Sequence, residues 1–265
     1  VVVGLALGML GDLLLALRYL VSIPALLLVL RLRRALKPVD RRDWPILFAI
    51  GFTGYFASFC LQMLGIDRLT GSLSSLLGAM NPIFIPILAA LFLHERITLS
   101  KIACVALSML GVVVIVGVGG TADAAGVLMM LVSVFLWSTA SIIIRRISGR
   151  YDPMQIALIA ICCALPLTGA WSLIELQSAA CSFSVQSVLA VLYMGIFGTA
   201  VTHSLWNYSL RVMDASFCSM FYPMQPLVSA ILGVLFLHET VTPSFILGAL
   251  MICGGIVAAV KSAPK

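Results

Sequence analysis

Long apolar runs, separated by short breaks of charged residues, glycine or proline, make up nearly the whole chain. A helix needs about 20 mostly apolar residues to cross a membrane, and most of these runs reach that length. We therefore predict an all-α membrane protein built as a ten-helix bundle. The expected spans are residues 1–10, 13–30, 45–64, 70–93, 98–117, 125–145, 153–175, 186–208, 214–237 and 242–260. The first run is too short to span, so we expect the chain to be cut inside its first helix.

The chain contains an internal sequence repeat with two copies. A shift of 144 residues aligns Met80-Asn81-Pro82 with Met224-Gln225-Pro226, and Phe92-Leu93-His94-Glu95 with Phe236-Leu237-His238-Glu239. The two copies divide the chain into a first repeat at residues 1–118 and a second at residues 124–262, each with five spans. Because five is an odd number, the second repeat crosses the membrane in the opposite direction. This predicts inverted repeats related by a pseudo-twofold axis in the membrane plane.

The composition indicates lipid as the solvent. Hydrophobic residues make up 62% of the chain, charged residues only 10%, and the mean hydropathy is +1.16. A soluble domain carries about 25% charged residues. The net charge of +6 sits in short loops, which argues against a nucleic-acid partner. The seven cysteines form no CxxC motif, so we expect neither a metal site nor a cofactor.

The basic residues concentrate in alternate loops. The positive-inside bias places the loops after the second, fourth, sixth and eighth spans, and the C-terminal tail, in the cytoplasm. These segments hold Arg31, Arg33, Arg34, Lys37, Arg41, Arg42, Arg96, Arg145, Arg146, Arg150, Arg211, Lys261 and Lys265. The other side has Arg68, together with Arg18 in the outer part of the second span.

Helix ends also carry signals. Thr242-Pro243 predicts an N-cap followed by proline in the first turn, and Thr98 holds the matching position in the first repeat. His94-Glu95 and His238-Glu239 then form tight turns on opposite membrane faces. Two interpretations of these turns remain open: they take part in gating, or their polar groups reach headgroups and water.

The repeated segment, at residues 80–116 and 224–260, has a fixed order: an apolar helix with proline, an apolar helix ending in glutamate, a turn, and a helix with glycine. Leu17-Arg18-Tyr19 opens the second span, and Trp137 lies in the sixth. These features resemble the EamA domain of the drug/metabolite transporter superfamily, including its Leu-Arg-Phe-type signature. The resemblance covers nearly the whole chain. It implies a ten-helix transporter with a central cavity, in a family whose members export amino acids or other small metabolites.

Polar residues at membrane depth tend to face the bundle interior or a wet cavity, and residues three or four apart share one side of a helix. Such spacing links Tyr55, Ser58 and Gln62 in the third span, and Ser74, Gly78 and Asn81 in the fourth. Together with the repeat equivalents of these stripes, it predicts a substrate site. The predicted site residues are Tyr55, Ser58, Gln62, Ser74, Asn81, Trp137, Thr199, His203, Trp206, Tyr222 and Gln225.

Two of these residues have alternative roles. His203 either binds substrate or carries a proton, or is a neutral histidine bonded to another helix. Trp137 either faces the cavity, or serves packing or the interfacial aromatic belt.

Pro82 and Pro226 are predicted hinges. Proline frees a backbone carbonyl from its intrahelical bond, and the amide of Asn81 or Gln225 can bond that carbonyl or a substrate. Both interpretations of each pair, a substrate-binding hinge and a locally satisfied kink, remain open.

The predicted lining is neutral, without the Lys/Arg cluster that a phosphate-bearing substrate requires. We therefore predict a transporter of the bacterial inner (plasma) membrane, with a cytoplasmic C-terminus, that exports small neutral or zwitterionic organic metabolites such as amino acids. Alternating access through a central cavity is the expected mechanism. Its partners are the small-molecule substrate and the lipid bilayer, and the sequence leaves monomer and homodimer open.

Two alternatives remain: a nucleotide-sugar or phosphorylated-metabolite antiporter, and a non-transporting membrane receptor. An enzyme is not expected, because no set of catalytic residues lies at depth.

Overall fold

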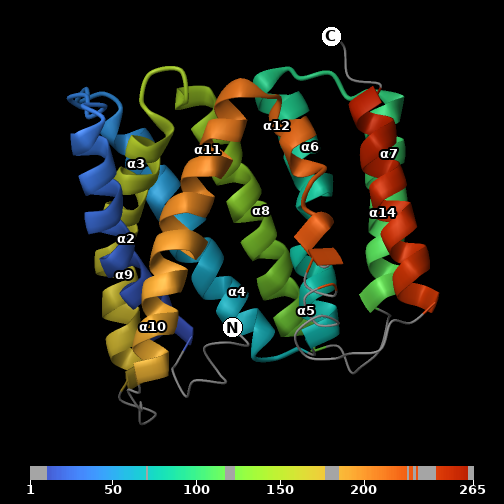
Figure 1. The fold of residues 1–265 in the computed structure, drawn as a ribbon, viewed down its shortest axis with the longest axis horizontal. Helices are drawn as coiled ribbons and strands as arrows, with labels where there is room; N and C mark the ends of the chain where they lie inside the picture. Colours follow the sequence, from blue (N-terminus) through green and yellow to red (C-terminus); the bar gives the residue numbers. More distant parts are fainter. Residues whose placement is uncertain are drawn as a thin grey trace. The chain divides into compact units, whose positions relative to one another are not determined.

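The computed structural model describes residues 11–69, 71–116, 123–176, 185–225, 227–228, 231 and 243–261. These residues form helices joined by short turns, with no strand among them (Figure 1). Within the described part of the chain, six helical stretches are long and apolar enough to cross a membrane. They are Leu13–Leu32, Trp44–Ile66, Leu76–Leu93, Ala124–Ile147, Pro153–Ile174 and Val185–Val212. Leu99–Val114 and Ile246–Ala258 are shorter apolar helices.

The chain forms two compact units. Unit 1 joins Val1–Met63 with Thr139–Val212, and unit 2 joins Leu64–Ser138 with Met213–Lys265. Each unit therefore takes one part from each half of the sequence, so the units are not the predicted repeats. The division into repeats at 1–118 and 124–262 stays a prediction.

Unit 1 contains two segments of π-helix that break otherwise α-helical spans. One span is α3 (Trp44–Ile50), η1 (Gly51–Ala57) and α4 (Ser58–Ile66), of which the last residues lie in unit 2. The other span is α10 (Val185–Tyr193), η2 (Met194–Val201) and α11 (Thr202–Val212). A shift of η1 by 144 residues lands on 195–201, so the two π-helices occupy equivalent positions.

The π-helices pack on the two remaining long helices of unit 1, α2 (Gly11–Leu32) and α9 (Pro153–Leu176). A Cβ atom on Gly51 would lie 2.7 Å from the Ala160 carbonyl oxygen of α9. A Cβ atom on Gly195 would lie 2.6 Å from Cβ of Val21 in α2. Only glycine permits such close approach. Because α2 and α9 are themselves equivalent under the 144-residue shift, the two contacts join equivalent elements, although the residues that the glycines meet are not equivalent.

Unit 2 contains α5 (Gly71–Gly78), α6 (Asn81–Leu93), α7 (Leu99–Val116), α12 (Ala215–Ser219) and α14 (Pro243–Lys261). The first part of α8 (Ala124–Ile147) belongs to it, and the last part belongs to unit 1. The most extensive helix pair of the described chain is α7 with α14, which lie side by side (Figure 1).

The α7–α14 contact is reciprocal. A Cβ atom on Gly111 would meet the Gly248 carbonyl oxygen at 2.7 Å and Ile252 Cγ1 at 2.8 Å. A Cβ atom on Gly255 would meet Ser108 Oγ at 2.8 Å and the Cys104 carbonyl oxygen at 3.1 Å. Under the 144-residue shift, the residues that Gly111 meets on α14 are the equivalents of those that Gly255 meets on α7. Equivalent contacts in both directions are the mark of a twofold relation. The glycine near the end of α7 meets residues in the earlier part of α14, and the glycine later in α14 meets residues in the earlier part of α7. The two helices therefore run antiparallel.

The predicted span 70–93 is interrupted. α5 ends at Gly78, and α6 begins at Asn81 after a turn in which the Met80 amide bonds to the Leu77 carbonyl at 3.1 Å. Pro82 is buried in the first turn of α6, where a missing N–H costs no helical bond. Pro82 therefore starts a helix rather than kinking one. Pro226 lies outside the described residues.

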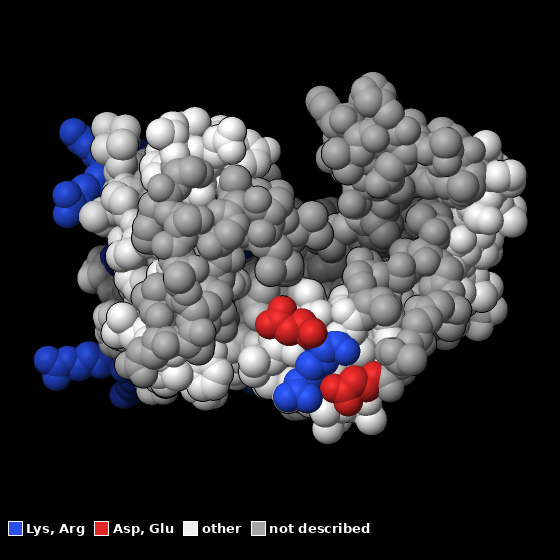
Figure 2. All heavy atoms as spheres, turned by 90° about the horizontal axis from the view of Figure 1, so that it is seen from below, with Lys and Arg blue, Asp and Glu red and all other residues white. Residues whose placement is uncertain are grey.

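Charged side chains are few on the described surface. Figure 2 shows one group in which acidic and basic side chains lie together among uncharged described atoms. Large apolar side chains are exposed along the helices, among them Leu128, Leu189 and Leu205. This distribution suits helices that face lipid.

Candidate functional site

Three predicted site residues meet in unit 1. Tyr55, Thr199 and His203 are all buried, and they come from η1, η2 and α11. His203 Nδ1 lies 2.8 Å from the Thr199 carbonyl oxygen, and the His203 ring centroid lies 4.8 Å from that of Tyr55. A carbonyl can only accept, so Nδ1 carries a proton in this arrangement. This bond joins His203 to its own preceding turn, and the alternatives for its role stay predictions.

The structure adds Arg18, which was not among the predicted site residues. Its side chain reaches from α2 to η2, where Nε donates to Thr199 Oγ1 at 3.0 Å and Nη2 donates to the Gly198 carbonyl at 3.4 Å. The expectation of a wholly neutral group of site residues is therefore wrong around Thr199. The signal in the sequence is an arginine within an otherwise apolar run, which the positive-inside bias places in the outer part of the span.

Neighbouring residues of α2 also bond to the π-helices. The Tyr19 hydroxyl donates to the Tyr55 carbonyl at 2.6 Å, and Ser22 Oγ donates to the Gly195 carbonyl at 2.8 Å. A π-helix displaces carbonyls from regular α-helical bonding, and buried side chains can satisfy them. One face of α2 thus supplies donors to both π-helices and holds Tyr55 and Thr199 in place.

The other predicted residues of unit 1 lie along the same helices. Trp206 Nε1 donates to Ser141 Oγ at 3.3 Å, which ties α11 to α8. Ser58 is buried at the start of α4, and Gln62 is partly buried one turn later. Trp206 and Gln62 are repeat equivalents, as are His203 and Phe59, whose ring centroids lie 6.0 Å apart.

A second group of predicted residues meets in unit 2. Asn81 Nδ2 donates to the Gly78 carbonyl at 3.1 Å, and Ser138 Oγ lies 3.3 Å from Asn81 Oδ1. Gly78 is the last residue of α5, so Asn81 bonds a carbonyl that the end of that helix leaves without an intrahelical partner. The Asn81 amide is thus satisfied locally, and its role in binding substrate stays a prediction.

Trp137 and Tyr222 form a direct contact in the same unit. Trp137 Nε1 donates to the Tyr222 hydroxyl, linking α8 to the turn after α12. Ser74 is buried, and its Oγ has no hydrogen-bond partner within the described part of the chain. Gln225 is exposed, one residue before the undescribed Pro226.

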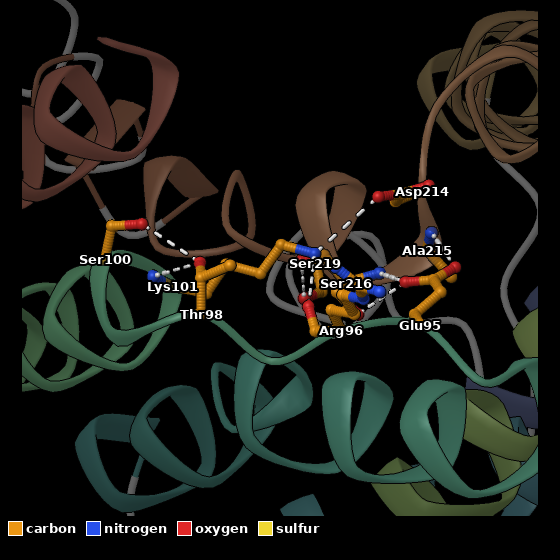
Figure 3. A network of polar contacts seen from close by, with 9 residues as sticks. All are labelled: Glu95, Arg96, Thr98, Ser100, Lys101, Asp214, Ala215, Ser216 and Ser219. Carbon is orange, nitrogen blue, oxygen red and sulfur yellow. Dashed lines mark hydrogen bonds and ion pairs between the residues drawn. The ribbon is translucent and has the colours of Figure 1, made fainter. Parts of the chain in front are cut away.

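The turn at His94-Glu95 binds another segment of unit 2 (Figure 3). The Glu95 carboxylate accepts from the Ala215 amide at 2.9 Å, the Ser216 amide at 3.1 Å and the Ser216 hydroxyl at 2.6 Å. Lys101 pairs with Asp214 at 3.6 Å. The Glu95 carboxylate therefore caps the start of α12. The matching Glu239 lies outside the described residues.

A polar network joins two loops of unit 1. The buried Asp43 carboxylate accepts from the Tyr151 hydroxyl at 2.8 Å and from Arg150 Nη1 at 2.7 Å. The hydrogen bond from Tyr151, followed by that from Arg150, lowers the pKa of Asp43 below its ordinary value of 3.8. Gln155 Nε2 donates to the Lys37 carbonyl at 2.6 Å. The loops after α2 and after α8, both predicted to be cytoplasmic, therefore lie at the same end of unit 1.

Within the described residues, no cluster of three or more histidine, cysteine, aspartate or glutamate side chains is placed to hold a metal ion. Among the described residues, the predicted site groups and the side chain of Arg18 offer amides, hydroxyls, aromatic rings and a guanidinium. Such groups can bind and release an organic molecule through hydrogen bonds, without covalent chemistry.

Comparison with known proteins gives consistent matches. The model of the EamA-like transporter family matches residues 9–117 and again residues 124–261. An uncharacterized transporter of Archaeoglobus fulgidus is 27% identical over 226 residues, covering 85% of this chain and 80% of its own length. A protein of Streptantibioticus cattleyicolor named a probable terminal-alkyne amino-acid exporter is 27% identical over 220 residues, covering 81% and 72%. A solved crystal structure aligns with a TM-score of 0.84 at 20% identity, covering 98% of this chain and 94% of its own, which shows a shared fold.

Proposed function

The chain belongs to the EamA-like transporter family of the drug/metabolite transporter superfamily, and from that premise we propose that it exports small neutral or zwitterionic organic metabolites, such as amino acids, by alternating access. It is a multi-pass membrane protein whose named relatives are transporters. The observation that carries the proposal is the burial of hydrogen-bonding side chains at membrane depth around two equivalent π-helices. Polar groups in lipid-depth helices are costly, and they mark substrate pathways in transporters.

The proposed architecture is ten helices in two inverted repeats. The antiparallel, reciprocal contact of α7 with α14 supports it, as do the equivalent positions of η1 and η2. The proposed setting is a bacterial inner membrane with a cytoplasmic C-terminus. The basic loops that share one end of unit 1 support this orientation.

The proposed substrate contacts fall into two groups. In unit 1 they are Tyr55, Ser58, Gln62, Thr199, His203 and Trp206. In unit 2 they are Ser74, Asn81, Trp137, Tyr222 and Gln225. The amino-acid class of substrate is supported by the printed role of the Streptantibioticus relative. Interruptions near midspan, such as the break before Pro82, resemble the discontinuous helices that form transporter sites.

Efflux from proteoliposomes tests the proposal. Vesicles carrying the full-length protein are loaded with a mixture of L-amino acids, and the external medium is analysed by mass spectrometry. We expect one class of amino acid to leave faster than from protein-free vesicles. His203→Phe installs the residue found at the equivalent position, Phe59, and should slow efflux by at least about tenfold while the protein stays folded.

Tyr208→Phe is the matched control. Tyr208 lies in the same helix as His203 but is exposed, so efflux should not change. Wild-type vesicles that release no amino acid faster than empty ones would refute the proposed substrate class. Equal efflux from the His203→Phe protein and the wild type would remove His203 from the site.

A further inference from the structure

The strongest unassigned feature of the described chain is a cation within a membrane-length helix. Arg18 lies five residues inside the stretch Leu13–Leu32, about 8 Å from its end at 1.5 Å per residue. Its recorded partners are the hydroxyl of Thr199 and the carbonyl of Gly198, and neither carries a charge. A cation at this depth is expensive unless it is paired, and it usually marks a function.

Within the described residues, the two bonds of Arg18 leave several N–H groups of its guanidinium able to donate to a ligand. Arginine carries about five N–H donors in a planar fork. Within the described residues, the bonds of Arg18 use Nε and Nη2 but not Nη1. Thr199 Oγ1 is itself fixed, because it donates to the Met194 carbonyl at 3.1 Å. The fork is thus held by η2 with donors to spare for a planar anion, and arginine suits carboxylates for this reason.

The fold itself does not require a charge at this position. The repeat equivalent of Arg18 is Cys162 in α9, and the equivalents of Thr199 and His203 are Tyr55 and Phe59. η1 therefore packs on α9, as η2 packs on α2, without an arginine at the position equivalent to Arg18. Arg18, Thr199 and His203 thus all differ from their repeat equivalents, and they lie on the same side of unit 1.

We propose that Arg18, held by Thr199 and Gly198 of η2, binds the carboxylate of the transported substrate. The inference rests on the proposed transport function and narrows its substrates to carboxylate-bearing metabolites, such as amino acids. A single guanidinium with hydroxyl and aromatic neighbours matches one carboxylate. A phosphate ester would call for a cluster of basic groups.

Ligand-induced thermal stabilisation tests the carboxylate role, because a ligand that binds the folded protein raises the unfolding midpoint, and at equal concentration a tighter ligand raises it more. The full-length protein in detergent is titrated with common L-amino acids and with the matching α-carboxamides. We expect the wild type to bind at least one amino acid more tightly than its amide. Arg18→Gln should weaken binding of the acid by about tenfold or more, and bring acid and amide close to equal affinity.

The comparison of acid with amide separates recognition from structure. Loss of a merely structural contact would weaken both ligands equally, which would overturn the proposal. So would an Arg18→Gln protein that keeps the wild-type preference for the acid, as expected if Arg18 binds a lipid phosphate instead. Arg146→Gln removes an exposed arginine of α8 and should leave both affinities unchanged.

A second variant covers the case in which Arg18→Gln does not fold. Arg18→Lys keeps the charge but loses the planar fork, so affinity for the acid should fall about tenfold while a preference over the amide remains. Unchanged affinity for the acid would overturn the proposal.

Efflux distinguishes this inference from the proposed function. Amino-acid efflux that survives Arg18→Gln at the wild-type rate refutes the carboxylate role and leaves the transporter standing. Absence of efflux from wild-type vesicles refutes both.

Discussion

Asp43 shows how a single residue ties the loops of unit 1 together. Its pKa is lowered first by the hydrogen bond from Tyr151 and then by Arg150, so the folded state holds the carboxylate ionised more readily than the unfolded state does. The stabilisation is therefore fully present above the ordinary pKa of 3.8. It is lost as the pH falls through the lowered folded-state pKa.

We expect Tyr151→Phe to reduce this acid sensitivity. The variant should be less stable than the wild type near neutral pH, and the difference between their unfolding midpoints should shrink as the pH falls below about 4. Thermal unfolding in detergent, followed by intrinsic fluorescence at several pH values, measures it. Other carboxylates titrate in both proteins and cancel in the difference. A difference that stays constant from neutral to acid pH would contradict the assignment.

Glycines of the π-helices set how closely the elements of unit 1 approach. Alanine at Gly51 or Gly195 would place Cβ within 2.7 Å or 2.6 Å of a neighbouring helix. We expect each substitution to cost about 1–3 kcal/mol of stability through overpacking. Gly169→Ala is the control, because nothing lies within 4 Å of its Cβ position in α9. That change should stabilise by about 0.5–1 kcal/mol, and a similar gain at Gly51 would show that the close contact is absent.

The start of α12 depends on Glu95, which supplies three of its hydrogen bonds. Glu95→Ala should leave the amides of Ala215 and Ser216 unbonded and destabilise unit 2 by about 1.5–3 kcal/mol. Hydrogen exchange at these two amides should rise well above the wild-type rate. Arg96→Ala is the matched control, because the recorded bond of Arg96 uses its backbone carbonyl, and exchange should stay unchanged. Equal exchange in the Glu95→Ala protein and the wild type would count against the cap.

The ends of elements were predictable where chain chemistry decides them. Expected spans 125–145 and 153–175 became Ala124–Ile147 and Pro153–Leu176, because charge and proline mark their limits. Thr98 caps α7 as predicted, with its hydroxyl 3.4 Å from the Lys101 amide. The π-helices and the break before Pro82 were not predicted. An apolar run looks the same whether its carbonyls bond four or five residues onward, and tertiary contacts decide between them.

The candidate site, like the helices, could be predicted only in part from the sequence. Periodicity indicated Tyr55 and Thr199, and side-chain chemistry indicated His203, one position beyond the stripe. The fold places the three together. It could not reveal that Arg18 joins them, because the contact between Arg18 and Thr199 spans 181 residues. Nor could it show that the amide of Asn81 is occupied by Gly78 and Ser138, since Ser138 belongs to a distant helix.

At the scale of the whole molecule, inverted repeats require equivalent loops to lie on opposite membrane faces. Asp67 and Arg211 hold equivalent positions, and both are exposed at helix ends. In a protein whose native cysteines are replaced, we expect Asp67→Cys to react with an impermeant maleimide only from outside the cell. Arg211→Cys should react only in inverted vesicles.

Neighbouring positions serve as controls for each face. Ala124→Cys should react from the same membrane face as Asp67→Cys. Arg68, next to Asp67, pairs at 3.4 Å with Asp123, next to Ala124. Arg146→Cys should label with Arg211→Cys, because the adjacent Arg145 donates to the Leu210 and Arg211 carbonyls. Labelling of Asp67→Cys and Arg211→Cys from one face would mean that each repeat crosses the membrane an even number of times. The reciprocal α7–α14 contact would then be a local symmetry of unit 2, and the inverted-repeat architecture would fall with the transport mechanism built on it.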